Sequence, residues 1–470
     1  MTALEPAPAA SLTPKPIGLV PPGPPRVDRT LLIAASGLLA SRVMDGLAAG
    51  TDRFSEQSPS SEPGLTAEVR NATPQVGNLY AGRLGAALFL SARGQIAGDD
   101  QAKDVALRVA EETVDDITSG TIDSSRAGIG GFVGLGGLIY GLTRIAQLTG
   151  EHAFAEAAQG LAGRLSADVI ASDRHLDVVH GSAGALLAFL ALPDLDRPSG
   201  DGLSALDRAE ICARHLLRRG HGSDGHGSDG HGSDGHGSDG HGSDGHGSED
   251  GSLAFVPPGD QDAKSGFAHG AAGIAAALAR LHKHRPRPEW PRAICQALDF
   301  VRRHYDPELD NWTPTLGDQV FTLGWCHGAP GVALAHLSIG ADLPAADRGS
   351  QFDRFEHDLQ ASLTACEKHR PTPLDHLCCG NMSRAETFLV AHHYAGSRDP
   401  AGQQATNTAL LDQCHRFALW VLRSAKTHGR FGVSQDPSSA YSFFQGLSGI
   451  GYGLLRIAEP RELPCVLLME

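Results

Sequence analysis

Stretches rich in alanine and leucine recur along the chain, and each follows a short glycine turn. The turn has the form Gly-x-x-Gly, and the apolar stretch after it predicts a helix whose first turn packs closely against its neighbours. The seven copies are LYAGRLGAALFL, FVGLGGLIYGLTRI, VVHGSAGALLAFL, FAHGAAGIAAALARL, WCHGAPGVALAHL, LCCGNMSRAETFLV and FFQGLSGIGYGLLRI. Their first glycines are Gly82, Gly134, Gly181, Gly270, Gly328, Gly380 and Gly446. The sixth copy has Ser383 in place of the second glycine, which we expect to loosen that turn.

More polar, amphipathic stretches lie between the copies. Examples are Gln101–Ile117, Phe154–Val169, Glu289–Tyr305 and Leu410–Ala425. A spacing of about 50–60 residues leaves room for two helices per repeat, one buried and one outer. The pattern therefore predicts an all-α fold, a double-layered α/α toroid (barrel) of seven helical hairpins. All seven glycine turns would gather at one end of its inner ring.

Two segments fall outside this pattern. Residues 1–30 are rich in proline and alanine, and we expect a flexible lead-in. Residues 220–251 repeat His-Gly-Ser-Asp-Gly and have nothing apolar to bury, which predicts a disordered insert. Its six histidines could chelate metal adventitiously, but a repeat expanded in a tolerant loop is the simpler interpretation. Residues 31–470 then form one domain, although 470 residues alone would suggest two or three.

Charge and composition narrow the class of protein. The 39 basic and 54 acidic residues give a net charge of −15, which argues against binding to nucleic acid or to an anionic membrane. The apolar run Leu31–Ala40 is far shorter than the roughly 20 residues of a membrane span, and residues 1–29 lack the pattern of a signal peptide. We therefore expect a cytoplasmic protein with reduced cysteines and no membrane span.

Residues with reactive side chains precede the third to sixth turns. They are Asp177 and His180, then His269, then Cys326 and His327, then Cys378 and Cys379. If the turns share one end of a barrel, these residues converge there. Thiols, imidazoles and a carboxylate together suit a zinc site with an acid–base group, and three protein ligands leave one position of the metal open. Thiolates favour zinc over hard cations. We expect His180 only to line the cavity.

The other cysteines lie in apolar surroundings, and we expect them to be core residues. They are Cys212, Cys295, Cys366, Cys414 and Cys465.

The motifs LDVVHGSAG, FAHGAAG, GWCHGAPG and HLCCGN, with FFQGLSGIGYGLLRIAEPRELPCVLLME, resemble those of the lanthionine synthetase C-like family. They are most similar to the C-terminal cyclase domain of class II lanthipeptide synthetases. The resemblance runs from about Leu31 to Glu470, interrupted by the insert. Its specific part is the Trp-Cys-x-Gly-x-Pro-Gly motif with the Cys-Cys/His-Gly pair.

This resemblance implies a toroid that holds one Zn²⁺ through Cys326, Cys378 and Cys379. The third ligand is usually histidine, and Cys379 matches a subgroup with three cysteine ligands. The family's catalytic histidine falls on His269 and its aspartate on Asp177, with His327 as an alternative proton donor. Four positions before the first ligand, where some stand-alone cyclases have a basic residue, this chain has Thr322.

The implied reaction is a Michael-type addition that closes thioether rings. A zinc-bound cysteine thiolate of the substrate attacks a dehydroalanine or dehydrobutyrine, and the resulting enolate takes a proton at Cα. The substrate would be a dehydrated precursor peptide. We expect no dehydratase or kinase activity, because no glycine-rich phosphate loop with a lysine is present. A separate dehydratase would therefore act first, or the chain is a detached cyclase half.

Two alternatives belong to other classes of function. Another zinc α/α-barrel transferase that activates a thiol, such as a protein prenyltransferase subunit, fits the metal, but that family uses an aspartate–cysteine–histidine ligand set. A non-catalytic scaffold of the same fold would bind the peptide or a dehydratase. The intact candidate residues argue against the scaffold, whereas Ser383 and the missing dehydratase are compatible with it.

Overall fold

The computed structural model describes residues 26–48, 78–122, 127–222, 252–257, 262–318, 321–348, 354–398, 404–436 and 439–470. Within these ranges the fold is all-α, apart from two pairs of two-residue strands. Residues 1–25 of the expected lead-in and residues 223–251 of the expected insert lie outside the described residues.

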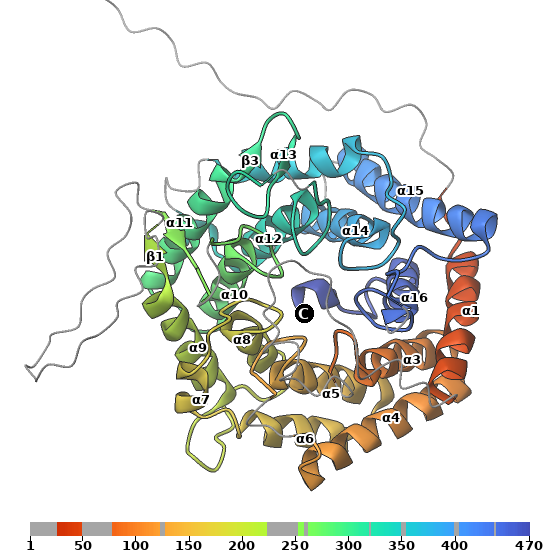
Figure 1. Cartoon of the computed structure of the whole chain (residues 1–470), viewed down its shortest axis with the longest axis horizontal. Coiled ribbons are helices and arrows are strands. Elements are labelled where there is room, and N and C mark those ends of the chain that lie inside the picture. Colours follow the sequence, from red (N-terminus) through yellow and green to blue (C-terminus); the bar gives the residue numbers. More distant parts are fainter. Residues whose placement is uncertain are drawn as a thin grey trace, which may run out of the picture.

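Seven helices form a closed inner ring (Figure 1). They are α3 (Arg83–Ala97), α5 (Leu135–Thr149), α8 (Ser182–Leu190), α10 (Ala271–His284), α12 (Ala329–Asp342), α14 (Asn381–Arg398) and α16 (Leu447–Ala458). Each packs against the next, and α16 packs against α3. Every one of them begins directly after the first glycine of a Gly-x-x-Gly copy, as the sequence pattern predicts.

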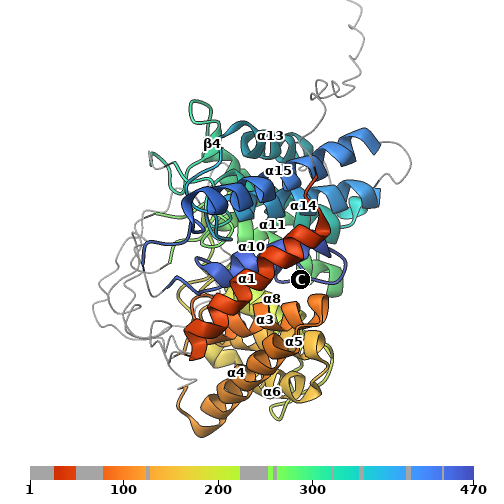
Figure 2. The same ribbon diagram turned by 90° about the vertical axis from the view of Figure 1, so that its right-hand side faces the viewer.

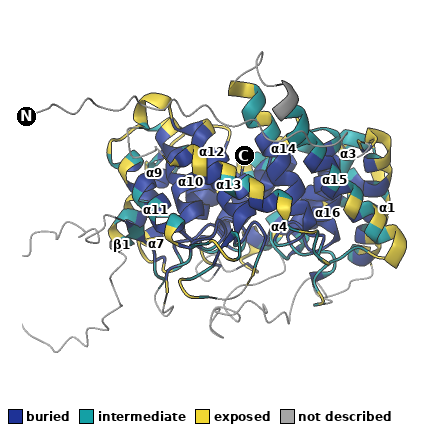
Figure 3. Cartoon of the chain, turned by 90° about the horizontal axis from the view of Figure 1, so that it is seen from above, coloured by how far each residue is buried: buried dark blue, intermediate teal, exposed yellow. Residues whose placement is uncertain are grey.

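The outer layer consists of helices that each pack on the inner helix before them. They are α4 (Asp100–Ser119), α6 (His152–Ala162), α9 (Ala205–Arg219), α11 (Glu289–Arg303), α13 (Phe355–Lys368) and α15 (Gln404–His428). The short helix α7 (Ala167–Ala171) lies against α9. Figure 3 shows the ring edge-on, with buried residues in the inner layer and the loops gathered along one edge. The predicted double-layered toroid is confirmed.

The seventh pair joins the two ends of the chain. Its outer helix is α1 (Arg29–Ala48), which packs on α16 and crosses the outside of the ring (Figure 2). Val27, just before α1, is buried, and its amide donates to His415 Nδ1 at 3.1 Å. The folded domain therefore starts a few residues earlier than the expected boundary at residue 31.

Helix α1 is the one helix in the described part of the chain that is long and apolar enough to cross a membrane by length and composition. Its buried residues include Leu32, Leu39 and Val43, which recur at helical spacing along one side. This stripe faces the ring, where α1 contacts α16 and α3. The apolar residues of α1 therefore pack against the ring.

Two short antiparallel strand pairs also occur within the described residues. Strand β1 (His221–Gly222) pairs with β2 (Leu253–Ala254), and β3 (Tyr305–Asp306) pairs with β4 (Asn311–Trp312). The first pair brings together the chain on either side of residues 223–251. The first residues of the expected insert, 220–222, are thus ordered, because Gly220 caps α9 and the next two residues pair with the returning chain.

The glycine turns are explained by close backbone approach. A Cβ on Gly184 would overlap the carbonyl oxygen of Val178, because the loop before α8 folds back over the first turn of that helix. In the sixth turn, Ser383 takes the place of the second glycine. Its amide donates to the Gly380 carbonyl at 3.1 Å and its hydroxyl donates to the same oxygen at 2.8 Å. The sixth turn thus keeps the amide–carbonyl bond that Gly184 makes to Gly181 in the third turn, also at 3.1 Å.

Backbone hydrogen bonds link neighbouring turns around the ring. They include Tyr80 N to Phe132 O, Phe132 N to Val179 O, Val178 N to Ala268 O, Trp325 N to Cys378 O, Cys378 N to Phe444 O and Phe444 N to Tyr80 O. Between the fourth and fifth turns, Gly266 lies so close to the Cys326 carbonyl that a Cβ would overlap it. All seven turns consequently form one continuous layer at one end of the ring, as expected.

The segment after α16 turns into the middle of the ring, where Figure 1 marks the C-terminus. Its backbone carbonyls accept hydrogen bonds from the walls: Tyr452 Oη donates to Pro464 at 2.9 Å, Trp325 Nε1 donates to Leu467 at 3.0 Å, and Tyr140 Oη donates to Glu470 at 3.1 Å. Leu467 is buried. This segment therefore supports the turn layer from inside the ring.

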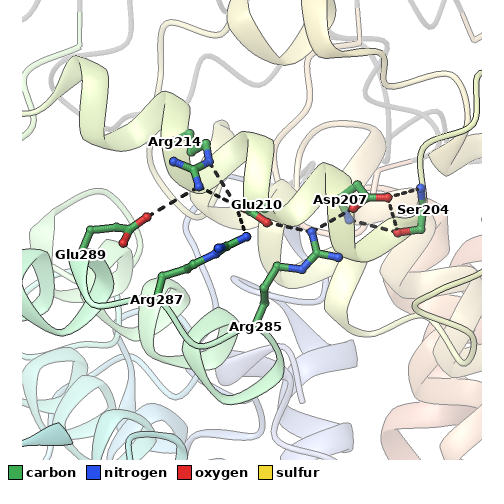
Figure 4. A network of polar contacts seen from close by, with 7 residues as sticks. All are labelled: Ser204, Asp207, Glu210, Arg214, Arg285, Arg287 and Glu289. Atoms are coloured by element: carbon green, nitrogen blue, oxygen red, sulfur yellow. Dashed lines mark hydrogen bonds and ion pairs between the residues drawn. The ribbon is translucent and has the colours of Figure 1, made fainter.

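A polar network ties α9 to the start of α11 (Figure 4). Glu210 accepts hydrogen bonds from Arg214 and Arg285, both at 2.7 Å, and forms an ion pair with Arg287 at 3.4 Å. Arg285 also donates to Asp207 at 2.9 Å. The Asp207 side chain in turn closes a capping box with Ser204 at the beginning of α9.

Candidate active site

Three cysteine thiols meet where the fifth and sixth turns join. The hydrogen bond from Trp325 N to the Cys378 carbonyl, 2.7 Å long, aligns the two turns. The Sγ of Cys379 lies 3.3 Å from that of Cys326 and 3.3 Å from that of Cys378, and all three sulfurs lie within 4.8 Å of one another. Cys326 and Cys378 are buried and Cys379 is half-buried, and none of them forms a disulfide.

This cluster fits a tetrahedral zinc ion. With Zn–S bonds of about 2.3 Å, two sulfur ligands lie about 3.8 Å apart, within the observed spread. Hydrogen bonds with Cys378 and Cys379, together with burial, raise the pKa of the Cys326 thiol well above its usual range. The Cys326 thiol therefore stays protonated at neutral pH, and a bound divalent cation would stabilise its thiolate form. Soft donors of this kind favour zinc over calcium or magnesium.

Tyr80 of the first turn supports one of these sulfurs. Its hydroxyl donates to Cys378 Sγ at 3.3 Å, and its ring stacks on Phe444 with centroids 4.8 Å apart. Sequence reasoning did not identify this contact. A signal was present, because Tyr80 occupies the same position of its turn, two residues before the first glycine, as Cys326 and Cys378.

An aspartate–histidine pair spans the third and fourth turns. His269 Nδ1 lies 2.8 Å from Asp177 Oδ2, and the backbone bond from Val178 N to Ala268 O holds the two turns side by side. Asp177 is buried, which alone would raise its pKa. The attraction of His269 and the contacts with His180 outweigh burial and hold the pKa of Asp177 well below its usual range. Asp177 is therefore ionised at neutral pH.

His180 shares this carboxylate, although sequence reasoning expected it only to line the cavity. Its amide donates to Asp177 Oδ1 at 2.6 Å, and its Nδ1 lies 3.6 Å from Asp177 Oδ2. Its ring also stacks on His269, with centroids 5.4 Å apart and an interplanar angle of 23°. The sequence places His180 beside the pair but does not indicate that its side chain turns toward Asp177.

His327 has its ring beside that of His269 and shares the fifth turn with Cys326. It directly follows Cys326, and its ring centroid lies 5.7 Å from that of His269. Its Nδ1 packs against Gly266, where a side chain would not fit, because a Cβ on Gly266 would be 2.6 Å from that nitrogen. His327 thus connects the carboxylate–imidazole group and the cysteine group into one arc.

These side chains lie in a row, here called the arc, because most of them occupy equivalent positions of neighbouring turns. The residue directly before the first glycine is half-buried in all seven turns, namely Ala81, Val133, His180, His269, His327, Cys379 and Gln445. The residue before it is buried in every turn except the first, where Tyr80 is half-buried. Consecutive turns therefore present consecutive side chains along the rim. The candidates Asp177, His269, His327, Cys326, Cys378 and Cys379 come together on four neighbouring turns.

The remaining sequence candidates lie apart from this arc or lack the chemistry. Thr322 is half-buried, and its carbonyl accepts a hydrogen bond from Asn311 Nδ2 at 2.8 Å. The five cysteines expected in the core are all buried. Burial raises the pKa of Cys295 and of Cys366 to about 12, so these thiols are unreactive at neutral pH.

Comparisons with known proteins agree with this architecture. A family model described as lanthionine synthetase C-like protein matches residues 73–468. Among solved structures, the chain is similar to nisin cyclase, with a TM-score of 0.55 and 15% sequence identity over 91% of this chain and 97% of that chain. At this identity the structural likeness shows the fold alone, whereas the family match covers most of the chain. The chain therefore belongs to the lanthionine synthetase C-like family.

Proposed function

We propose that this protein is a zinc-dependent lanthipeptide cyclase. It would add peptide cysteine thiolates to dehydroalanine or dehydrobutyrine and so form lanthionine and methyllanthionine rings. The observation that carries the proposal is the arrangement of three thiols within 4.8 Å of one another on turns next to the ionised Asp177 and its partner His269. The family supports cyclase activity, and these residues would supply both a thiol-activating metal site and an acid–base group.

Cys326, Cys378 and Cys379 would hold the zinc ion, with one position left for the substrate. When bound, zinc lowers the pKa of a coordinated thiol so that its thiolate exists at neutral pH. Three thiolate ligands would donate more charge to the metal than a set that includes histidine, and a coordinated substrate sulfur would then be more nucleophilic. Tyr80 holds Cys378 in place through its hydroxyl hydrogen bond.

His269 is the proposed proton-transfer residue, and Asp177 sets its tautomer. An ionised carboxylate can only accept hydrogen bonds, so Asp177 Oδ2 requires that His269 Nδ1 carries a proton. In the neutral ring, Nε2 is then the basic nitrogen. The charged ring can donate from Nε2, and the Asp177 carboxylate stabilises that cation.

The proton balance of the reaction needs such a group. The thiol loses its proton, a carbon–sulfur bond forms at Cβ, and the π electrons of the dehydroamino acid move into an enolate. That enolate takes one proton at Cα, so the net change is addition of S–H across the double bond. His269 would deliver this proton, and His327 is the alternative donor because its ring neighbours that of His269 and it directly follows Cys326.

The proposed substrate is a dehydrated precursor peptide, supplied in the cytoplasm by a separate dehydratase. We propose no role in nucleic-acid binding, since the net charge is −15. A scaffold without turnover and another zinc α/α-barrel thiol transferase are the two alternatives.

The test is metal analysis coupled to a thiol-capping assay on a dehydrated peptide that contains cysteine. One zinc per cysteine cluster with progressive loss of free thiol is the expected result. Retained zinc with no thiol loss would favour the scaffold, and protein whose cluster binds no zinc would contradict both enzyme interpretations. Cys378→Ala should abolish metal binding at the cluster, whereas His269→Ala should keep that metal and lose rate.

A further inference from the structure

A second group of three ligand atoms lies one turn away from the thiols. Asp177, His180 and His269 each offer one ligand atom, and these atoms lie within 4.8 Å of one another. A single oxygen, Asp177 Oδ2, faces His269 Nδ1 at 2.8 Å and His180 Nδ1 at 3.6 Å. Two N or O ligands on one tetrahedral ion lie about 3.3–3.6 Å apart, given metal bonds of about 2.0–2.2 Å. The His180 contact already has this separation, and the His269 contact is slightly shorter.

The backbone holds this group in place. The His180 amide donates a hydrogen bond to Asp177 Oδ1, and the other carboxylate oxygen, Oδ2, then faces the two imidazoles. The stacked rings of His180 and His269 come from adjacent turns that are joined by the hydrogen bond from Val178 N to Ala268 O. The three side chains keep 9–13% of their surface exposed, so the group is largely covered but within reach of solvent.

Two imidazoles and one carboxylate are a donor set for borderline divalent metals such as zinc, cobalt, nickel and iron. We propose that Asp177, His180 and His269 form a second divalent transition-metal site, distinct from the three-cysteine site. An ion there would bind the Nδ1 lone pairs of both histidines and displace the His269–Asp177 hydrogen bond. Zinc in excess would thereby inhibit cyclisation, a consequence that rests on the proposed function, whereas the site itself does not.

The site is tested by titrating cobalt into the full-length, metal-free protein. Cobalt on thiolates gives intense charge-transfer absorption, whereas cobalt on imidazole and carboxylate gives only weak bands. Apart from any cobalt held by the histidines of the His-Gly-Ser-Asp-Gly repeat, wild type should bind one ion with the charge-transfer signal and one without it. His180→Gln should weaken the second ion by at least about 10–100-fold, the loss typical even of outer-shell partners, and leave the first unchanged.

His175→Gln is the matched control. His175 is also half-buried, and its ring lies 5.6 Å from that of His180, but it is not part of the three-residue group. Its titration should match that of wild type. The histidines of the His-Gly-Ser-Asp-Gly repeat are the same in all three proteins, so any cobalt they hold cancels in the comparison. Equal second-ion affinity in wild type and a folded His180→Gln protein would overturn the proposal, as would equal losses in both variants.

The inhibitory consequence needs a second measurement. Zinc added beyond the amount that saturates the cysteines should lower the rate of thiol loss in wild type and much less in His180→Gln. If zinc inhibits the two proteins equally, it does not inhibit through this site. If neither protein cyclises peptide, the proposed function fails, and the cobalt titration still decides whether the second site exists.

Discussion

Trp325 Nε1 donates a hydrogen bond to the carbonyl oxygen of Leu467 at 3.0 Å, inside the ring and directly beside the proposed metal ligand Cys326. The bond joins the fifth turn to the segment that follows α16. A segment more than 140 residues away in sequence thus supports the turn that carries this proposed ligand.

Trp325→Phe should therefore lower both the stability and the zinc affinity of the protein. The substitution leaves the buried Leu467 carbonyl without its donor, which costs about 1–3 kcal/mol of unfolding free energy. Metal affinity should fall by about tenfold or more, because a residue that orients a ligand has moved. Trp290→Phe is the control: Trp290 is also fully buried, but its indole nitrogen has no hydrogen-bond partner within the described residues. Equal zinc affinity in both variants would contradict the supporting role of the segment after α16.

Asp177→Asn should lower kcat by about 10²-fold or more and keep the zinc of the cysteine cluster. Asparagine can still accept the His180 amide, but it removes the charge that orients and stabilises protonated His269. Asp173→Asn is the control, because Asp173 accepts from Ser182 N at 2.8 Å and Ser182 Oγ at 2.6 Å and so fastens the same turn. It should lower stability and leave kcat of the folded enzyme unchanged. Steady-state kinetics with metal analysis distinguishes the two.

Glu210→Gln should destabilise the fold by about 2 kcal/mol, because it leaves three arginines around a neutral side chain that is only 10% exposed. Chemical denaturation measures the change. Glu156→Gln removes an exposed ion pair with Arg197 and should change stability by less than about 0.5 kcal/mol. A similar small change in both variants would show that the network of Figure 4 contributes no more than an ordinary surface pair.

Asp207 makes part of the stability depend on pH in the acid range. Hydrogen bonds from the backbone and hydroxyl of Ser204, then from Arg285, lower its pKa to about 2. An unfolded aspartate has a pKa of about 3.9. The contribution of Asp207 is therefore fully present above about pH 4 and is lost as pH falls toward 2. Asp207→Asn should lower Tm at pH 6 and lower it less at pH 3; an equal difference at both pH values would contradict this sign.

The sequence pattern was sufficient to predict the residue at which each inner helix begins. Glycine is required where a carbonyl oxygen lies against the backbone, as the Val178 oxygen does at Gly184. This requirement is local, and the repeat of Gly-x-x-Gly in the sequence reveals it. It also placed Asp177, His269 and Cys326 at one end of the ring, because equivalent turns lie together.

Relationships between distant segments could not be predicted in this way. The pairing of α1 with α16 and the insertion of Leu467 depend on how the ring closes, and no local pattern encodes that. Side-chain directions were also out of reach. His180 and Tyr80 stand at repeat positions shared with candidate residues, yet only the fold shows that one turns toward Asp177 and the other toward Cys378.

The central claim is that this arc adds a thiol across a dehydroamino acid and delivers a proton to Cα. The most direct measurement runs the reaction in D₂O on a dehydrated, cysteine-containing peptide, returns the product to H₂O and determines its mass. Addition leaves the mass unchanged in H₂O and should leave one carbon-bound deuterium for each thiol lost in D₂O. His269→Ala should slow this incorporation. Loss of thiol without retained deuterium would contradict the account.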